Sequence, residues 1–287
     1  MSGLQAEPSL LHLQPLDLDA VEVLLCDADG NLFPSEEPAF AASTEVTNRF
    51  LATHGIERRF TPDELRLAAT GRNFRSTARE LAAEAGRSVD GDELEYWVRE
   101  ERQAVVAHLG RVLRPDPAVT APLEALARRF RLAVVSSSAT ERLAVCFRAA
   151  GLDSLFAAAV RFSAEDSLPS PTSKPDPAIY ALAGRELDVE GAAGLAVEDA
   201  VAGVRSAVAA GFPAVGNLQF VPADEREGRI AGLRDAGAAA IVESWSDLAA
   251  LLDGRGGAYS RAGKAPASRD SVSAPSSSPK SRSAMSP

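Results

Sequence analysis

Apolar and polar positions along most of the chain follow the rhythm of short buried strands separated by helices. The clearest strand is the apolar run at residues 21–26, which ends abruptly at Asp27-Ala28-Asp29-Gly30, as a buried strand does when it opens into a loop. From residue 114 onward, strand-like runs alternate with helical stretches. This alternation predicts an α/β fold with a Rossmann-like, doubly wound parallel sheet. We expect strands at 21–26, 132–135, 158–162, 194–197, 214–216 and 239–242, and helices near 118–130, 140–150, 177–187, 200–210, 224–236 and 246–252.

The segment between the first strand and residue 114 has a helical pattern throughout. Thr61-Pro62-Asp63-Glu64 is typical of a helix start, with Thr as the N-cap, Pro in the first turn and Glu closing a capping box. Gly55, Gly86 and Gly110 stand where helices can end. Four helices without a strand predict a helical domain at 36–113, inserted between two parts of an α/β core at 17–35 and 114–254.

Both ends of the chain lack a pattern that could build a core. Residues 1–16 are predicted to form a flexible arm, and the Ser-, Ala- and Pro-rich residues 255–287 a disordered tail. No apolar run approaches the roughly 18 residues of a membrane span, and the start of the sequence lacks the segments of a signal peptide. We therefore expect a cytoplasmic protein with no membrane partner.

Composition narrows the classes of function. The net charge is −10, and the tail from Arg255 holds six Lys or Arg and one Asp, which leaves −15 on the rest of the chain. Such an acidic body argues against a nucleic-acid partner, which would require a clustered basic face. Two cysteines cannot make a disulfide framework or fill a zinc site. Three histidines and the lack of a Gly-rich nucleotide motif give no support to a Ser-His-Asp hydrolase or a P-loop enzyme.

Polar residues of chemical interest follow three of the predicted strands. They are Asp27 and Asp29, Ser136-Ser137-Ser138, and Glu198-Asp199, while Lys174, the body's single lysine, lies in a loop. Taken alone, each has a structural explanation as a turn, a helix cap or an exposed loop residue. The carboxyl ends of parallel strands are, however, the usual ligand site of such sheets. Together the carboxylates fit Mg²⁺, which prefers oxygen ligands, and the hydroxyls and the ammonium fit a phosphate.

In this order, these residues resemble the four motifs of the haloacid dehalogenase superfamily, and more narrowly its β-phosphoglucomutase-like phosphatases with a helical cap. The resemblance runs from about residue 24 to residue 218. It implies a core interrupted by a cap at 36–113, with hinges near 34–38 and 114–117. The motifs read Asp27-Ala28-Asp29-Gly30-Asn31-Leu32-Phe33, Val134-Val135-Ser136, Lys174-Pro175-Asp176-Pro177 and Val197-Glu198-Asp199-Ala200-Val201-Ala202-Gly203.

The resemblance also implies an activity, which is Mg²⁺-dependent hydrolysis of a small phosphorylated metabolite such as a sugar phosphate. Asp27 is then the nucleophile that forms an aspartyl phosphate, and Asp29 is the general acid and base. The implied phosphate-binding residues are Ser136, Ser137 and Lys174. The implied metal ligands are Asp27, the Asp29 carbonyl, Asp199 and Glu198.

The resemblance further places a substrate-reading loop between two cap helices. Gly71, Arg72, Asn73 and Arg75 are its candidates to touch the leaving group or a second phosphate. Two departures from the family pattern stand out. Asn31 replaces the usual Thr, from which we expect an altered rate rather than a loss, and a Ser/Pro-rich connector at 167–173 lengthens the loop that must deliver Lys174.

Two alternatives remain open on the sequence. A sugar-phosphate mutase uses nearly the same residues as a phosphatase. A non-catalytic binding or regulatory member of the fold is the second alternative, although Asp27, Asp29 and Lys174 are all retained. A dehalogenase lacks the aspartate that Asp29 supplies, and a phosphonatase needs a cap lysine, which is absent here. The sequence sets no oligomeric state, and a monomer is compatible with it.

Overall fold

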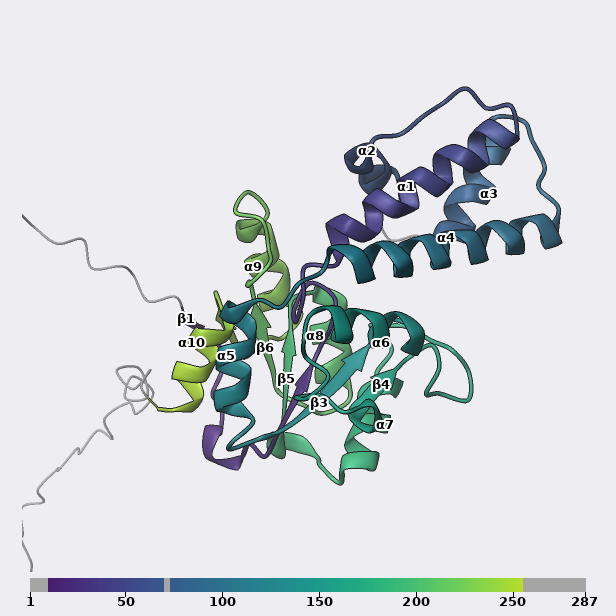
Figure 1. Cartoon of the computed structure of the whole chain (residues 1–287). Helices are drawn as coiled ribbons and strands as arrows, with labels where there is room; N and C mark the ends of the chain where they lie inside the picture. Colours follow the sequence, from purple (N-terminus) through teal and green to yellow (C-terminus); the bar gives the residue numbers. More distant parts are fainter. Residues whose placement is uncertain (1–9, 70–72, 255–287) are drawn as a thin grey trace, which may run out of the picture.

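A seven-stranded sheet forms the centre of the computed structural model, which describes residues 10–69 and 73–254 (Figure 1). The strands are β1 (Leu10–His12), β2 (Val23–Cys26), β3 (Arg131–Ser136), β4 (Arg161–Ser163), β5 (Gly194–Glu198), β6 (Ala214–Asn217) and β7 (Ala240–Val242). Their order is β1-β7-β6-β5-β2-β3-β4, and all neighbours are parallel except β1 and β7. The predicted doubly wound α/β fold is confirmed.

Helices cover both faces of this sheet. Leu24 and Cys26 of β2 belong to the apolar cluster beneath α5 (Pro117–Leu126), α6 (Thr140–Ala149) and α10 (Trp245–Leu252). Val23 and Leu25 face the opposite cluster, beneath α7 (Ala178–Leu187), α8 (Val201–Ala209) and α9 (Arg226–Asp235). Because successive side chains of a strand point to opposite faces, burial on both faces makes β2 apolar throughout.

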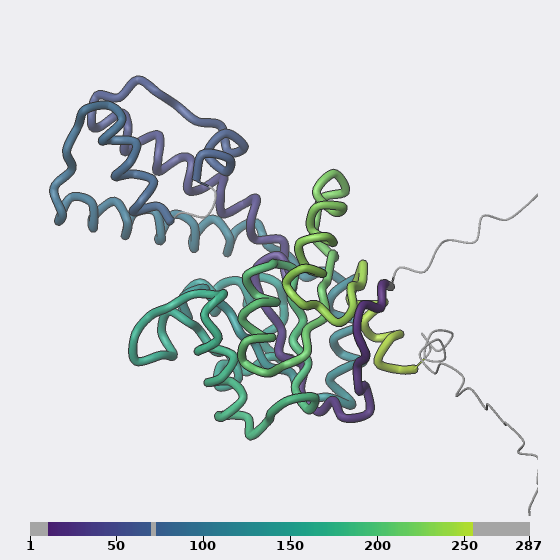
Figure 2. Tube along the Cα trace, turned by 180° about the vertical axis from the view of Figure 1, so that it is seen from behind, coloured from purple at the N-terminus to yellow at the C-terminus, as the bar shows by residue number. Residues whose placement is uncertain are grey.

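A separate group of helices, which we call the cap, lies beyond one end of the sheet in Figures 1 and 2. It consists of α1 (Glu36–Thr53), α2 (Pro62–Ala68), α3 (Phe74–Glu84) and α4 (Gly91–Val112). The cap has its own apolar cluster, in which the ring of Phe50 meets those of Phe74 and Trp97 edge to face. No helix of the described ranges, in cap or core, is long and apolar enough to cross a membrane.

The predicted start and stop signals of the cap helices hold at three positions and fail at one. The Thr61 hydroxyl accepts from the backbone N–H of Glu64, whose carboxylate accepts from the Thr61 N–H at 2.8 Å. Gly55 and Gly86 follow the ends of α1 and α3 with positive φ. Gly110 was expected to end a helix but lies inside α4. A Cβ at Gly110 would come within 2.8 Å of the Val145 side chain, so this glycine lets α4 pack closely on α6.

Two other segments differ from the sequence-based expectation. Residues 10–12, predicted as part of a flexible arm, form β1 and pair antiparallel with β7. Residues 158–160, predicted as the start of a strand, form a 3₁₀ turn, and β4 begins only at Arg161. Both are short edge elements. Their stability comes from pairing with the rest of the sheet rather than from a periodic pattern of their own.

Candidate active site

Most of the residues predicted to carry chemistry meet at the carboxyl ends of three adjacent strands. The register of the sheet sets Cys26, the last residue of β2, opposite Val134 of β3 and Val197 of β5. Asp27 follows directly, and its N–H donates to the Val197 carbonyl at 2.9 Å. Asp27 therefore stands between the serine-rich loop after β3 and the acidic pair at the end of β5.

Two glycines make room for the carboxylates at this edge. A Cβ at Gly30, where φ is +77°, would lie 2.6 Å from Oδ2 of Asp199. A Cβ at Gly203 would lie 1.7 Å from Oε2 of Glu198. A side chain at either position would displace a carboxylate, so the site itself requires glycine there.

Lys174 lies inside the acidic cluster, with its side chain only 6% exposed. Its Nζ donates to Oδ1 of Asp27 at 2.5 Å, to Oε1 of Glu198 at 2.6 Å and to the Val135 carbonyl at 2.7 Å. The hydroxyl of Tyr180 donates to the same Glu198 oxygen at 2.5 Å. The lone lysine of the body thus reaches Asp27 in spite of the lengthened connector that precedes it.

Burial and charge repulsion together raise the pKa values of the carboxylates in this cluster. Loss of hydration is the largest cause for Asp27, Glu198 and Asp199, and it raises the pKa of Glu198 to about 7. Lys174 opposes this rise at Asp27 and Glu198. Burial would lower the pKa of Lys174, but Asp27 and Glu198 outweigh it and hold that pKa above its ordinary value. The single ammonium therefore contacts two of the three carboxylates, Asp27 and Glu198.

The same three carboxylates form a set that could hold a metal ion. Asp27, Glu198 and Asp199 each offer an oxygen, and these oxygens lie within 4.8 Å of one another. All three residues are buried, and Oε2 of Glu198 has no hydrogen-bond partner. An orphaned oxygen among mutually repelling carboxylates fits a divalent cation that prefers oxygen ligands. The contribution expected from the Asp29 carbonyl stays a prediction.

Arg229 of α9, which the sequence analysis did not single out, contacts Asp199 through its guanidinium. Its Nη1 donates to the Asp199 carbonyl at 2.7 Å and lies 3.4 Å from Oδ2. The guanidinium therefore fixes the orientation of Asp199 and moderates the rise in its pKa.

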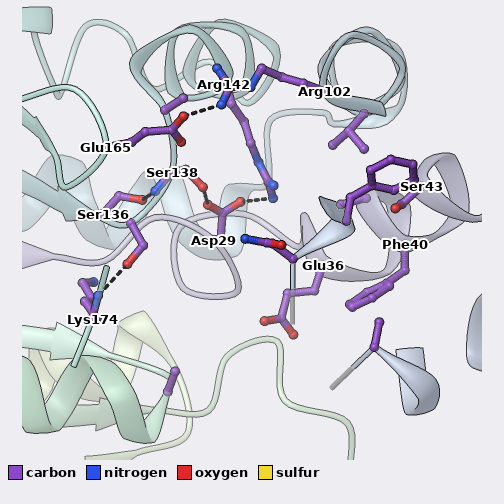
Figure 3. A pocket seen from close by; sticks show the side chains of 18 of the residues that line it. Asp29, Glu36, Phe40, Ser43, Arg102, Ser136, Ser138, Arg142, Glu165 and Lys174 are labelled. Atoms are coloured by element: carbon purple, nitrogen blue, oxygen red, sulfur yellow. Dashed lines mark hydrogen bonds and ion pairs between the residues drawn. The ribbon is translucent and has the colours of Figure 1, made fainter. Parts of the chain in front are cut away.

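The carboxylate of Asp29 receives three donors, and Figure 3 shows the contacts with Ser138 and Arg142. Oδ1 accepts from the Ser35 hydroxyl and, at 2.6 Å, from Nη2 of Arg142, while Oδ2 accepts from the Ser138 hydroxyl at 2.6 Å. Burial would raise the pKa of Asp29, but the Arg142 guanidinium and the two hydroxyls hold it below its usual value. Asp29 is therefore ionised in this arrangement.

The serines after β3 divide into different local roles. The Ser136 hydroxyl accepts from the Ser138 N–H at 3.0 Å, and the Ser137 hydroxyl accepts from the Lys174 N–H at 3.1 Å. Both Ser136 and Ser137 line the cavity described below, and their role in binding a phosphate stays a prediction. Ser138, which the sequence did not assign a role, contacts Asp29 instead.

Asn31 is fully buried and ties the loop after β2 to two neighbouring strands. Its Nδ2 donates to the Asp27 and Val197 carbonyls, both at 3.0 Å, and its Oδ1 accepts from Nδ2 of Asn217 at 2.8 Å. The Asn31 carbonyl accepts from the Trp245 indole at 2.9 Å. A threonine hydroxyl has a single O–H and could not donate to both the Asp27 and the Val197 carbonyls, as the Asn31 amide does.

A cavity of about 570 Å³ lies between the cap and the carboxyl ends of the strands. Its core side includes Asp27, the candidate nucleophile. Figure 3 shows Asp29 and Lys174 on the same side, and Phe40 and Ser43 on the cap side. The volume falls within the range of small-molecule sites.

The predicted cap contacts are only partly found at this cavity. Asn73 lines it, although its Oδ1 is already engaged as the N-cap of α3, where it accepts from the Ser76 N–H. Arg75 does not line it and pairs with Glu95 of α4. Gly71 and Arg72 lie outside the described residues.

A sheet with this strand order, a helical cap inserted after β2 and clustered carboxylates with one lysine define the class of protein. The family model for haloacid dehalogenase-like hydrolases matches residues 21–211, which span the cap and most of the core. The chain therefore belongs to this family, and the resemblance found in the sequence is confirmed.

Several solved structures share the fold over nearly their whole length. A predicted phosphoglycolate phosphatase from Haemophilus somnus has a TM-score of 0.64 at 21% identity, covering 81% of this chain and 98% of its own. A putative β-phosphoglucomutase from Thermotoga maritima has 0.61 at 25%, covering 81% and 99%. A variant of CbbY from Rhodobacter sphaeroides, in complex with xylulose 1,5-bisphosphate, has 0.60 at 24%, covering 79% and 96%. No curated protein matches by sequence.

Proposed function

We propose that this protein is a Mg²⁺-dependent phosphatase that hydrolyses a small phosphomonoester through an aspartyl phosphate on Asp27. The observation that carries the proposal is the position of Asp27 at the end of β2. There it contacts Lys174, and together with Glu198 and Asp199 it forms a cluster of carboxylates that lines a cavity. Family membership and the phosphatase-like structural neighbours support a hydrolase with this chemistry.

In the first half of the reaction, a carboxylate oxygen of Asp27 forms a bond to phosphorus while the bond to the leaving oxygen breaks. The leaving oxygen takes its proton from Asp29, which gives the free alcohol and an aspartyl phosphate. Asp29 is ionised while Arg142 holds it. Its contact with Arg142 must therefore loosen for Asp29 to carry that proton.

In the second half, Asp29 acts as a base. It takes a proton from water as the water oxygen bonds to phosphorus, and the bond to Asp27 breaks to give inorganic phosphate and the regenerated carboxylate. Lys174, Ser136 and Ser137 bind phosphoryl oxygens in this proposal, which is supported by the presence of all three on the cavity wall. Asp27, Glu198 and Asp199 would hold Mg²⁺. Its positive charge would offset the repulsion between these carboxylates and the phosphoryl group of the substrate.

Asp27→Asn tests this function. The amide keeps the shape of the side chain but is a far weaker nucleophile, so phosphate release from p-nitrophenyl phosphate with Mg²⁺ should fall by several orders of magnitude. Asp235→Asn, an exposed carboxylate of α9, is the matched control and should keep full activity. Substantial phosphate release by a folded Asp27→Asn protein would refute the proposal.

A sugar-phosphate mutase is the second candidate, supported by the structural likeness to a putative β-phosphoglucomutase. A mutase uses the same aspartyl phosphate but returns the phosphoryl group to another hydroxyl of the sugar. Monitoring both free phosphate and isomerised product from a set of sugar phosphates separates the two. Isomer without free phosphate would favour the mutase.

A further inference from the structure

The cap side of the cavity combines apolar and polar side chains in equal number among the described residues that line it. Phe40 of α1, Leu65 of α2, Phe74 of α3 and Val105 of α4 all line it, so each cap helix contributes an apolar side chain. The core side, by contrast, is lined by carboxylates, hydroxyls and Lys174. A bound ester would therefore place its phosphoryl group against the core and its alcohol part against the apolar side chains of the cap.

One polar group on the cap side has no partner. The Thr77 side chain of α3 lines the cavity, the residue is 4% exposed, and its Oγ1 is buried without a hydrogen bond. Leaving a buried hydroxyl unpaired is unfavourable, because it has lost its hydration without gaining a partner. A neutral hydrogen-bonding group on the ligand, such as a hydroxyl, would satisfy it.

The charges around the cavity oppose a second anionic group on the ligand. Among the described residues that line it, seven are carboxylates and three are cations. Each cation already has a carboxylate partner: Lys174 contacts Asp27, Arg142 contacts Asp29, and Arg102 contacts Glu165. A divalent cation would offset only part of this excess, and the phosphoryl group itself adds nearly two negative charges.

Glu101 and Glu36 bring carboxylates to the cap half itself. Both line the cavity, from α4 and α1 respectively. Burial raises the pKa of each, although nearby arginines oppose the rise. A carboxylate or second phosphate on the alcohol part of the ligand would meet these groups in a poorly hydrated space.

We propose that the alcohol part of the substrate is uncharged, with an apolar body that packs on the cap wall and a hydroxyl that pairs with Thr77. The substrate is accordingly a phosphomonoester with one phosphate and no other acidic group. This inference rests on the proposed phosphatase function and names its substrate class.

Three esters that differ only at one substituent test the inference: 4-hydroxymethylbenzyl, 4-methylbenzyl and 4-carboxybenzyl phosphate. With Mg²⁺, kcat/KM for phosphate release should be highest for the hydroxymethyl ester and at least about tenfold lower for the carboxy ester. Binding of the intact esters to Asp27→Asn, measured by calorimetry, should follow the same order. Equal or better turnover and binding of the carboxy ester would overturn the substrate class.

Two variants assign the preference to residues. Thr77→Val should lower the ratio of hydroxymethyl to methyl turnover about two- to tenfold, the range of one neutral hydrogen bond. Glu101→Gln should reduce the ratio of kcat/KM for the hydroxymethyl ester to kcat/KM for the carboxy ester. Thr53→Val and Glu100→Gln, a hydroxyl and a carboxylate of the cap that do not line the cavity, are the matched controls and should leave both ratios unchanged.

The outcomes separate this inference from the proposed function. If none of the esters releases phosphate but Asp27→Asn binds them in the predicted order, the phosphatase assignment fails and the uncharged-ligand site stands. If phosphate is released without the predicted order, the function stands and the substrate class is wrong. If neither Thr77→Val nor Glu101→Gln changes the kcat/KM ratios, the preference among the esters does not come from the cap side of the cavity.

Discussion

The carboxylate of Asp29 receives its donors from three separate parts of the chain: Ser35 at the start of the cap, Ser138 after β3, and Arg142 in α6. The sequence pointed to Asp29 but not to Arg142. The two are 113 positions apart, and Arg142 is one of many arginines in a body with a single lysine. Lys174 stood out in the sequence because it is the single lysine of the body. Arg142 and Arg229, in contrast, reach their aspartate partners only through tertiary packing.

The first prediction at the residue scale concerns Arg142. Removing its guanidinium in Arg142→Met takes away the main influence that keeps the pKa of Asp29 low, so that pKa should rise. Because Asp29 must be ionised to activate water, the acid limb of the kcat–pH profile should move to higher pH. Arg148→Met, which removes an exposed arginine of the same helix, is the control. An unmoved acid limb in a folded Arg142→Met protein would contradict this role.

At the scale of elements, the core strands were predictable because burial on both faces makes them uninterrupted apolar runs. The position of the site was predictable for a related reason. Parallel strands bring their carboxyl ends together at one edge of the sheet, so the polar residues that directly follow each strand are expected to meet there. β1 and β4 are short edge strands without such a signal, and the sequence missed the first and shifted the second. Gly110 was misinterpreted because close packing of α4 on α6 cannot be read from one helix alone.

Two helical glycines give a prediction that distinguishes site requirements from helix propensity. Gly203→Ala in α8 should displace Glu198, since the new Cβ would lie 1.7 Å from its Oε2, and should lower both activity and the free energy of unfolding. Gly228→Ala in α9 meets nothing within 4 Å. It should be neutral or stabilise the fold by up to about 1 kcal/mol, as expected for an open helical position. Urea unfolding and phosphate release measure both effects, and an active, stabilised Gly203→Ala would be inconsistent with the site.

At the scale of the whole molecule, the cap has an apolar cluster of its own, while Val105 and Leu109 of α4 belong to the apolar cluster of the core. Cap and core therefore meet along α4 as well as at the cavity. Arg102–Glu165 and Arg66–Glu225 are ion pairs between cap and core residues. The strong negative charge of the body, which in the sequence argued against a nucleic-acid partner, is in part gathered around this cavity, where a cation and Lys174 can offset it. The sequence predicted that a metal site and a phosphate site lie together, but it did not predict the apolar side chains that the cap contributes to the cavity.

Metal binding should therefore be visible in the stability of the whole fold. Mg²⁺ binds the folded site and should raise Tm. Asp199→Asn should raise Tm without Mg²⁺, because the pKa of Asp199 is well above its usual value and its ionised form costs stability at neutral pH. The same variant should reduce the gain in Tm from Mg²⁺, whereas Asp235→Asn should retain it. Equal Mg²⁺ gains in Asp199→Asn and the parent protein would remove Asp199 from the metal site.

The central claim is that Asp27 accepts the phosphoryl group, and trapping that intermediate tests it most directly. In Asp29→Asn, p-nitrophenyl phosphate can still donate its phosphoryl group because its leaving group needs no acid, but water is no longer activated. After an acid quench, mass spectrometry should find a peptide containing Asp27 that carries one phosphoryl group. Absence of that species, or a phosphoryl group on another residue, while p-nitrophenol is still released, would contradict the mechanism.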